Sequence, residues 1–421
     1  MIGESTVSLN GVDYRWPAAP VVVVCIDGGD PAYIEHGLHD GTLPNIARFV
    51  GEGFSALADG TMPSFTCPNN MSLVTGAPPA VHGISGNFYL DVRTGEAVVM
   101  TGPELLRSPT ILATFAAAGA KVVAVTAKDK LRRQLAKDLD LNHGNVCFSS
   151  EFAARCTFQE NGIEDVIELT GMAAPDIYSM ELSLFVLEAG IRLLVRDRPD
   201  LMFLSLTDYI QHKHAPGDPV AGAFFGRLDE CFGRLASLGA TVALTADHGM
   251  SDKSRPDGSP NVIYLQDILD EAFGAGNTRV VCPITDAFVR HHGSLGGFVR
   301  VWCVGGRASP AAVIALLDGR PGIVAALGRD EVCARFDLPP DREGDVAVIG
   351  DAGVVIGSTP ADHDLASLRD ARLRSHGSLA EARVPFILNR PLNPTYLRRA
   401  SRGPLRSLEI FDYAINGTVP E

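Results

Sequence analysis

The sequence predicts an α/β fold, because short β-branched runs alternate along the chain with longer segments of helical periodicity. The strand-like runs are apolar throughout, which is typical of parallel strands buried on both faces of a sheet. With 421 residues, of which 46% are hydrophobic, the chain can form one large α/β domain or two ordinary ones. The expected strands are residues 21–26, 121–126, 201–206 and 241–246, and the expected helices are residues 43–51, 180–195 and 220–238.

The pattern changes after Gly249. A polar loop rich in proline and glycine follows at 251–261, and less regular strand-like runs then flank a helical segment at 311–317. These runs are residues 278–284, 298–304 and 346–356. A strand of the earlier type returns at 384–388. The predicted division is therefore a core of residues 1–254 and 369–421, with residues 255–368 inserted as a small α+β cap domain.

Composition narrows the range of partners. The 36 Lys and Arg residues against 50 Asp and Glu residues give a formal net charge of −14, which disfavours a nucleic-acid backbone or an anionic membrane surface as a general partner. The longest apolar run is far shorter than the ~20 residues of a spanning helix, and the first residues lack the basic start of a signal peptide. The eight cysteines form no CxxC pair and lie mostly in apolar runs, so we expect reduced core cysteines in a cytoplasmic protein.

Carboxylates and histidines follow the ends of several predicted strands. Asp27 comes directly after the first strand, and Asp247 follows the strand at 241–246. Asp208 is followed one helical turn later by His212, so these two side chains can face the same point. Open parallel sheets bind their ligands at the carboxyl ends of the strands. The six candidates are Asp27, Asp208, His212, Asp247, His248 and His376.

Three aspartates and three histidines at separate strand ends can provide two sets of three metal ligands. Mixed oxygen and nitrogen ligation suits Zn²⁺, and Mn²⁺ or Fe tolerate the same donors. Two such ions about 4 Å apart would stabilise both the attacking and the leaving oxygen of a phosphoryl displacement. A single aspartate after a strand is more often a helix N-cap. The joint occurrence of all six residues nevertheless favours a two-metal site.

A hydroxyl nucleophile is expected in the segment 61–76. Residues 62–69 read Met-Pro-Ser-Phe-Thr66-Cys-Pro-Asn, and residues 75–87 read Thr-Gly-Ala-Pro-Pro-Ala-Val-His82-Gly-Ile-Ser-Gly-Asn87. These residues resemble the nucleophile block of the alkaline phosphatase superfamily, in its nucleotide pyrophosphatase/phosphodiesterase branch, which reads Pro-x-x-Thr-Phe-Pro-Asn and then Thr-Gly-x-x-Pro-x-x-His-Gly-Ile. The resemblance extends to the motifs around the six candidates. It implies an alkaline-phosphatase-like sandwich whose mostly parallel central sheet is flanked by helices.

The resemblance also implies a role for each candidate. One zinc ion would be held by Asp208, His212 and His376, and the other by Asp27, Thr66, Asp247 and His248. Thr66 would attack phosphorus and form a phosphothreonine, which a hydroxide supplied by the second zinc would hydrolyse. Asn87 would donate a hydrogen bond to a phosphoryl oxygen, and His212 and His376 would also face the substrate. We interpret His82 as structural.

A positive cluster follows the strand at 121–126. It reads Ala-Lys128-Asp-Lys130-Leu-Arg132-Arg133 and is the densest in this acidic chain. Together with the Thr66 block it resembles the phosphonoacetate hydrolases of the same superfamily, in which the two lysines would bind the substrate carboxylate. Positive charge there would stabilise the carboxymethyl carbanion that leaves when the C–P bond breaks. The two arginines fit a solvated helix start instead.

The leading hypothesis is therefore an enzyme, a dizinc hydrolase that converts phosphonoacetate to acetate and phosphate. A nucleotide pyrophosphatase or phosphodiesterase with the same metals and nucleophile is the first alternative, although Asn70 stands where many phosphodiesterases have histidine. A non-enzymatic metal-binding relative is the second, and it predicts a lost ligand or nucleophile. The expected partner is one small anionic phosphonate, with no nucleic acid and no membrane, and a homodimer stays open.

Overall fold

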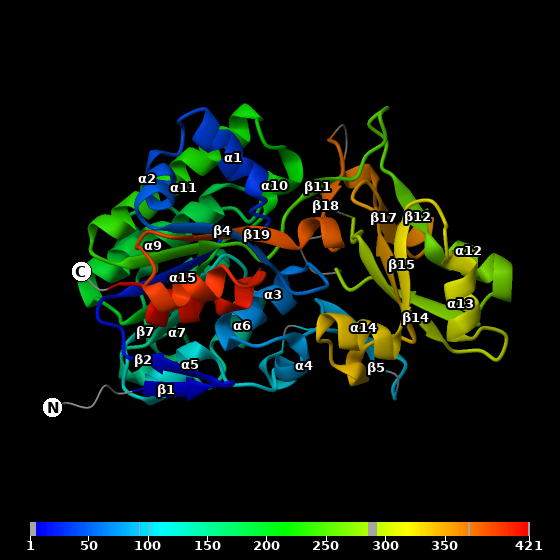
Figure 1. The fold of residues 1–421 in the computed structure, drawn as a ribbon, viewed down its shortest axis with the longest axis horizontal. Coiled ribbons are helices and arrows are strands. Elements are labelled where there is room, and N and C mark those ends of the chain that lie inside the picture. The colour runs from blue at the N-terminus through cyan, green and yellow to red at the C-terminus, as the bar shows by residue number, and fades with distance from the viewer. Residues whose placement is uncertain (1–5, 92, 101, 285–292, 369–370, 420–421) are drawn as a thin grey trace.

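The computed structural model describes residues 6–91, 93–100, 102–284, 293–368 and 371–419 (Figure 1). Its largest element is an eight-stranded sheet in the order β20-β4-β19-β10-β3-β9-β7-β8. Five neighbouring strands of this sheet run parallel to one another. They are β10 (Thr241–Thr245), β3 (Val21–Cys25), β9 (Leu201–Ser205), β7 (Val122–Thr126) and β8 (Val146–Ser149). The mostly parallel central sheet predicted from the sequence is confirmed.

Side chains of β3 alternate between two hydrophobic clusters, one on each face of the sheet. Val22 and Val24 belong to one cluster, whereas Val21, Val23 and Cys25 belong to the other, and all five are buried. This burial on both faces explains why the strand sequences are apolar throughout. One face is covered by α1 (Pro31–His39), α2 (Pro44–Glu52), α9 (Glu181–Asp197) and α11 (Pro219–Ser237), and the other by α3 (Thr66–Thr75), α5 (Ile111–Ala117), α6 (Asp129–Leu135) and α16 (Ile410–Asp412).

The strand β19 (Arg383–Leu388) differs from the expectation in its direction. It pairs antiparallel with both β10 and β4 (Phe54–Asp59), whereas the sequence predicts a strand of the same type as the others. An apolar run indicates burial on both faces, but burial alone does not distinguish the two directions of a strand. Because of its direction, β19 begins at the edge of the sheet where β10 and β3 end.

A second sheet of four antiparallel strands forms in the later part of the chain, at the right of Figure 1. Its strands in spatial order are β13 (Thr278–Val281), β14 (Phe298–Cys303), β16 (Val346–Gly350) and β15 (Ile323–Gly328). The helices α12 (Leu265–Phe273), α13 (Pro310–Leu317) and α14 (Arg329–Phe336) contribute to its hydrophobic cluster. Phe65, which precedes α3, packs in the same cluster. The boundaries of an inserted domain at 255 and 368 stay a prediction.

The sequence does not predict several short elements. Among them are the strands β4, β8 and β20 (Leu405–Arg406) and the hairpins β1–β2 (Thr6–Leu9, Val12–Arg15) and β5–β6 (Phe88–Asp91, Glu96–Val99). β8 has only four residues, and β4 alternates exposed and partly buried positions, so neither has the continuous apolar run of the central strands. No described helix combines the length and the apolar character needed to cross a membrane.

Candidate active site

Four neighbouring parallel strands end at one edge of the large sheet, and a candidate residue follows each of them. Asp247 lies two residues after β10, Asp27 two residues after β3, Asp208 three residues after β9 and Lys128 two residues after β7. Since these strands are adjacent in that order, their carboxyl ends bring the four side chains together. His376 reaches the same edge because it shortly precedes the antiparallel strand β19.

The three candidate histidines are oriented by the backbone. Nδ1 lies 2.7, 2.9 and 2.8 Å from the carbonyl oxygens of Arg374, Gly249 and Ser64 in His212, His248 and His376, respectively. A carbonyl oxygen only accepts hydrogen bonds, so each Nδ1 carries the proton and each Nε2 presents its lone pair. Burial lowers the pKa of His248, and burial followed by the other two histidines lowers that of His376 well below its ordinary value. Both rings are therefore neutral, as metal ligation requires.

Two groups of three ligand atoms lie close enough together to hold a cation. One group is Asp208, His212 and His376, the other is Asp27, Asp208 and His248, and the donor atoms of each group lie within 4.8 Å of one another. Asp247 lies beside the second group, with Oδ2 3.6 Å from Nε2 of His248. The structure thus brings all six candidates together, with Asp208 shared between the groups. Their division between two ions stays a prediction.

Burial makes this cluster electrostatically unfavourable without cations. The pKa of Asp27 is raised well above its ordinary value, first by burial and then by the charges of Asp208 and Asp247. Burial also raises the pKa of Asp247 to about 7. Oδ1 of Asp27 is buried and accepts no hydrogen bond from the described part of the chain. Cations between these carboxylates would offset both the burial and the repulsion, so the donor set fits divalent metal ions.

Lys128 reaches the centre of the cluster. Its Nζ lies 3.2 Å from Oδ2 of Asp27 and 3.1 Å from Oδ1 of Asp208, and its side chain is 4% exposed. The expected partner of this ammonium is a substrate carboxylate, whereas here it forms ion pairs with two predicted metal ligands. Lys130 lies in the first turn of α6 with a partly exposed side chain. Contact of either lysine with a substrate stays a prediction.

Thr66 is the first residue of α3 and is almost fully buried. Its Oγ1 lies 3.4 Å from Nε2 of His248. The first turn of a helix has backbone N–H groups without intrahelical partners, and the helix dipole favours negative charge beside them. Oδ1 of Asn87 accepts a hydrogen bond from the backbone N–H of Cys67 at 3.2 Å, and its Nδ2 donates to the carbonyl of Ile284 at 3.3 Å. Thr66 and Asn87 therefore lie at the same end of α3.

Asn70 is a site residue whose contacts the sequence does not reveal. Its Nδ2 donates to the carbonyl of Thr66 at 3.0 Å and to Oδ2 of Asp247 at 3.2 Å. Its Oδ1 accepts a hydrogen bond from Oγ of Ser205 at 2.9 Å. The signal that points to it is its spacing of four residues from Thr66, which places both on one face of a helix. Asn70 thus fixes a predicted metal ligand, Asp247, relative to the predicted nucleophile, Thr66.

His82 has a structural environment, in agreement with its interpretation from the sequence. Its Nε2 lies 2.9 Å from Oγ of Ser72, and its Nδ1 accepts a hydrogen bond from the backbone N–H of Ile84 at 3.1 Å. Burial lowers its pKa to about 3, so the ring is neutral at neutral pH. Both ring nitrogens are thus used within the fold.

The architecture is the alkaline-phosphatase-like fold expected from the sequence, with the candidate residues gathered at the carboxyl edge of its sheet. The chain belongs to the type I phosphodiesterase / nucleotide pyrophosphatase family, whose sequence model matches residues 21–378. It is similar to a solved phosphonoacetate hydrolase from Sinorhizobium meliloti 1021, which is known in complex with phosphonoformate and with phosphonoacetate. The two are 44% identical, with a TM-score of 0.94 over 99% of this chain and 100% of that chain.

Two more distant relatives match the chain, one by structure and one by sequence. Murine ectonucleotide pyrophosphatase / phosphodiesterase 5 is 16% identical, with a TM-score of 0.62 over 96% of each chain. An uncharacterized pyrophosphatase/phosphodiesterase of Schizosaccharomyces pombe is 23% identical over 291 residues, which are 64% of this chain and 53% of the relative. The chain thus spans about half the length of this curated relative.

Proposed function

We propose that this protein is a metal-dependent hydrolase that cleaves the C–P bond of phosphonoacetate to yield acetate and phosphate. The observation that carries the proposal is the 44% identity, over 99% of the chain, to a phosphonoacetate hydrolase solved with phosphonoacetate. The site supports it, because a buried Asp/His cluster, a hydroxyl at a helix N-terminus and a lysine lie at one sheet edge. The substrate class that follows is a small anionic phosphonate.

The buried donors fit two divalent cations, and zinc suits their mixture of carboxylate and imidazole groups. We assign Asp208, His212 and His376 to one ion, and Asp27, Thr66, Asp247 and His248 to the other. Ions bound there would lower the pKa of a coordinated hydroxyl group and offset negative charge on phosphoryl oxygens. The raised pKa values of Asp27 and Asp247 support this assignment, because they report carboxylates that need a compensating positive charge.

Thr66 would be the nucleophile. Its oxygen forms a bond to phosphorus while the C–P bond breaks, and the hydroxyl proton leaves to solvent. The N-terminus of α3 stabilises the charge that develops on the phosphoryl group. Asn87 would donate the second hydrogen of its Nδ2 to a phosphoryl oxygen, since Ile284 accepts the first. Water then hydrolyses the phosphothreonine, which releases phosphate and regenerates Thr66.

The leaving group requires positive charge. The electron pair of the broken bond stays on the carboxymethyl carbon, and the resulting carbanion delocalises into its carboxylate before a proton converts it to acetate. A cation at that carboxylate stabilises charge that is larger in the transition state than in the substrate. We assign this role to Lys128 and Lys130. Lys128 would exchange its ion pairs with Asp27 and Asp208 for the substrate carboxylate once those aspartates bind metal.

Product analysis with zinc-loaded protein tests the proposed function. Phosphonoacetate should yield phosphate and acetate in equal amounts, measured by phosphorus and proton NMR, and a chelator should abolish both. Thr66→Ala should retain less than about a tenth of the turnover with metals saturated, because no other hydroxyl replaces the nucleophile. Nucleoside diesters and p-nitrophenyl phosphate esters complete the panel. Faster turnover of a nucleoside diester than of phosphonoacetate would contradict the proposal and favour a nucleotide phosphodiesterase.

Two lysine variants extend the same experiment to substrate recognition. Lys128→Met and Lys130→Met should reduce turnover of phosphonoacetate far more than turnover of p-nitrophenyl phosphate, which has no carboxylate. Equal losses on both substrates would exclude a carboxylate-binding role for these lysines, while the hydrolase assignment would stand.

A further inference from the structure

Ser64 is a fully buried residue that precedes the predicted nucleophile, Thr66, by two positions. Its backbone carbonyl accepts a hydrogen bond from Nδ1 of His376 at 2.8 Å. Its hydroxyl donates to the carbonyl of Ser378 at 2.7 Å and accepts the backbone N–H of Gly377 at 3.1 Å. Ser64 therefore bonds three consecutive residues. One residue beside the predicted nucleophile thus holds a predicted metal ligand that lies 312 positions further along the chain.

Close packing accompanies these hydrogen bonds. Gly377 has a φ of 115°, a conformation that favours glycine, and a Cβ atom at this position would collide with the ring of Phe65. Phe65 is fully buried, and its ring meets the ring of His376 edge-on, with the centroids 5.6 Å apart. The residues before Thr66 and the residues around His376 are therefore in direct contact, with no room for a further side chain at Gly377.

The segment that Ser64 contacts is itself anchored by a buried ion pair. Oε2 of Glu381 accepts hydrogen bonds from the backbone N–H and from the hydroxyl of Ser378, both at 2.9 Å. Oε1 of Glu381 lies 2.8 Å from Nζ of Lys253, and both side chains are fully buried. Buried polar networks whose members are hydrogen-bonded make the surrounding structure rigid. Ser64 therefore joins the residues before Thr66 to a rigid part of the fold.

His248 connects this contact to the rest of the candidate active site. The ring of His376 stacks on the ring of His248, with the centroids 3.5 Å apart and an interplanar angle of 7°. Nε2 of His248 in turn lies 3.4 Å from Oγ1 of Thr66. A shift of His376 would therefore change its position relative to the predicted nucleophile and relative to a second predicted ligand. The hydrogen bonds of Ser64 oppose such a shift.

We propose that Ser64 is a positioning residue, whose hydroxyl holds His376 and Thr66 at the separation that the reaction requires. This inference rests on the proposed function, in which Thr66 attacks phosphorus and His376 binds one of two metal ions. Groups that orient a ligating histidine contribute about 10–100-fold to metal affinity or activity. Ser64→Ala keeps the carbonyl that orients the His376 ring and removes the hydroxyl that holds the two residues after it. The variant therefore isolates the role of the hydroxyl.

Steady-state kinetics of zinc-saturated Ser64→Ala with phosphonoacetate test this role. The kcat should fall about a hundredfold, as expected for a displacement of about 1 Å, while KM changes less than about threefold, because the lost positioning affects the chemical step. Titration of the zinc-loaded chain with a chelator of known affinity should show one ion bound about tenfold more weakly. A kcat within about threefold of the wild-type value would overturn the proposal.

The chelator titration separates this proposal from the proposed function, because it needs no substrate. A wild-type chain that does not hydrolyse phosphonoacetate would contradict the proposed function. The titration then decides the role of Ser64. Equal zinc affinity of Ser64→Ala and the wild type, or no zinc binding by either, would overturn the positioning role. If Ser64→Ala does not fold, Ser64→Cys repeats both measurements, because a thiol is only a weak donor and acceptor.

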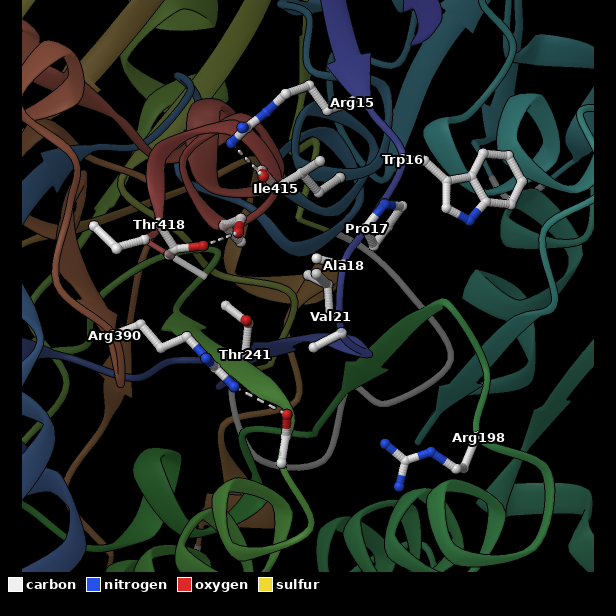
Figure 2. A pocket seen from close by; sticks show the side chains of 14 residues that line it. Arg15, Trp16, Pro17, Ala18, Val21, Arg198, Thr241, Arg390, Ile415 and Thr418 are labelled. Atoms are coloured by element: carbon white, nitrogen blue, oxygen red, sulfur yellow. Dashed lines mark hydrogen bonds between the residues drawn. The ribbon is translucent and has the colours of Figure 1, made fainter. Parts of the chain in front are cut away.

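Thr418→Val is the matched control. The Thr418 hydroxyl is also buried and donates to a backbone carbonyl, that of Ala414 at 2.9 Å. Figure 2 shows Thr418 lining the same cavity as Val21 and Thr241, the first residues of β3 and β10, at the edge of the large sheet opposite the candidate active site. Both variants should lower the urea midpoint of unfolding, because each loses a buried hydrogen bond. Only Ser64→Ala should lower kcat and zinc affinity, and equal losses of kcat in the two variants would overturn the proposal.

Discussion

Asn70 connects three parts of the candidate active site through one buried side chain. Its amide nitrogen donates to the carbonyl of Thr66 and to the carboxylate of Asp247, while its oxygen accepts from Ser205. The helix that carries the predicted nucleophile and the strand end that carries a predicted ligand are thereby fixed relative to each other. A small change in the distance between these two elements should slow catalysis, because a displacement of about 1 Å lowers rates by roughly a hundredfold.

Asn70→Asp should therefore lower kcat for phosphonoacetate by about a hundredfold. The substituted side chain has the same size, but its ionised form cannot donate to Asp247 and adds a negative charge beside the cluster. Zinc affinity should not weaken, since the added charge attracts cations. Steady-state kinetics and zinc titration separate the two effects, and Asn142→Asp repeats the change at an exposed position. Loss of zinc binding with an unchanged kcat at saturating zinc would contradict the positioning role.

At the residue scale, the sequence predicts which side chains gather but not all of their contacts. Asp27 and Asp247 are predictable because each directly follows a buried apolar strand, and the strand end determines where a short side chain lies. The ion pairs of Lys128 are not predictable in this way, because a long flexible side chain can reach several partners from one backbone position. The contacts of Asn70 depend on how α3 packs against the sheet.

At the scale of elements, the second sheet is joined to the loop that carries Asn87. Arg300 of β14 is fully buried, and its Nε donates to Oε2 of Glu343 at 2.6 Å. Its Nη2 donates to the carbonyl of Ser85 at 2.7 Å. The backbone N–H of Asn87 donates to the carbonyl of Pro283 at 2.8 Å. The position of the Asn87 amide therefore depends on the second sheet as well as on α3.

Arg300→Met should destabilise the protein by about 3–5 kcal/mol, because it leaves the Glu343 carboxylate buried without its partner. Arg300→Met combined with Glu343→Leu removes both charges and should recover most of this stability, as measured by urea unfolding. The double variant still lacks the hydrogen bond to Ser85. Its kcat/KM for phosphonoacetate should fall about tenfold, as expected for the loss of a single hydrogen bond that positions the predicted substrate-binding residue Asn87.

An Asn87→Ala background provides the control for this prediction. If the Arg300–Glu343 pair acts through Asn87, the double variant should cause no further loss of kcat/KM once Asn87 is absent. Losses that multiply in the two backgrounds would show that the pair acts elsewhere in the site.

The central parallel strands were predictable as elements because each is a continuous apolar run between helical segments. The direction of β19 was not, since its burial is that of its neighbours. The contact between Arg300 and Ser85 joins residues 215 positions apart and has no local signal in the sequence. Periodicity thus predicts the elements that are buried, whereas pairing direction and contacts between sheets arise from the tertiary structure.

At the scale of the whole molecule, metal binding at the predicted site would be coupled to folding through the buried carboxylates. Asp247 has a pKa of about 7 in the folded chain, above its ordinary value of 3.8. The folded state therefore binds this proton more tightly than the unfolded state. The associated stability is present below about pH 4 and is lost as the pH rises through about 7. Zinc-loaded protein, in which the carboxylate is ionised and paired with a cation, should not show this loss.

Zinc removal should consequently cost more stability at pH 8 than at pH 5. The difference in unfolding free energy between zinc-loaded and chelated protein should increase by up to about 1.4 kcal/mol per pH unit for each such carboxylate, and level off above pH ~7. Urea unfolding at pH 5, 6, 7 and 8 with a fixed free zinc concentration provides the measurement. A difference that is constant or that shrinks with rising pH would show that these carboxylates are not the ligands.

The antiparallel direction of β19 has a consequence for the route of the chain. β10 ends at the carboxyl edge of the sheet and β19 begins there, so the chain leaves and re-enters the large sheet at one place. The short strands β11 (Ser251–Asp252) and β18 (Arg374–Ser375) pair with each other at this crossing. The described strands between them lie outside the large sheet, and the pairing of β11 with β18 joins the two ends of this segment. Its length and content can therefore change between relatives without changing the order of the strands in the large sheet, while His376 stays beside the other predicted metal ligands.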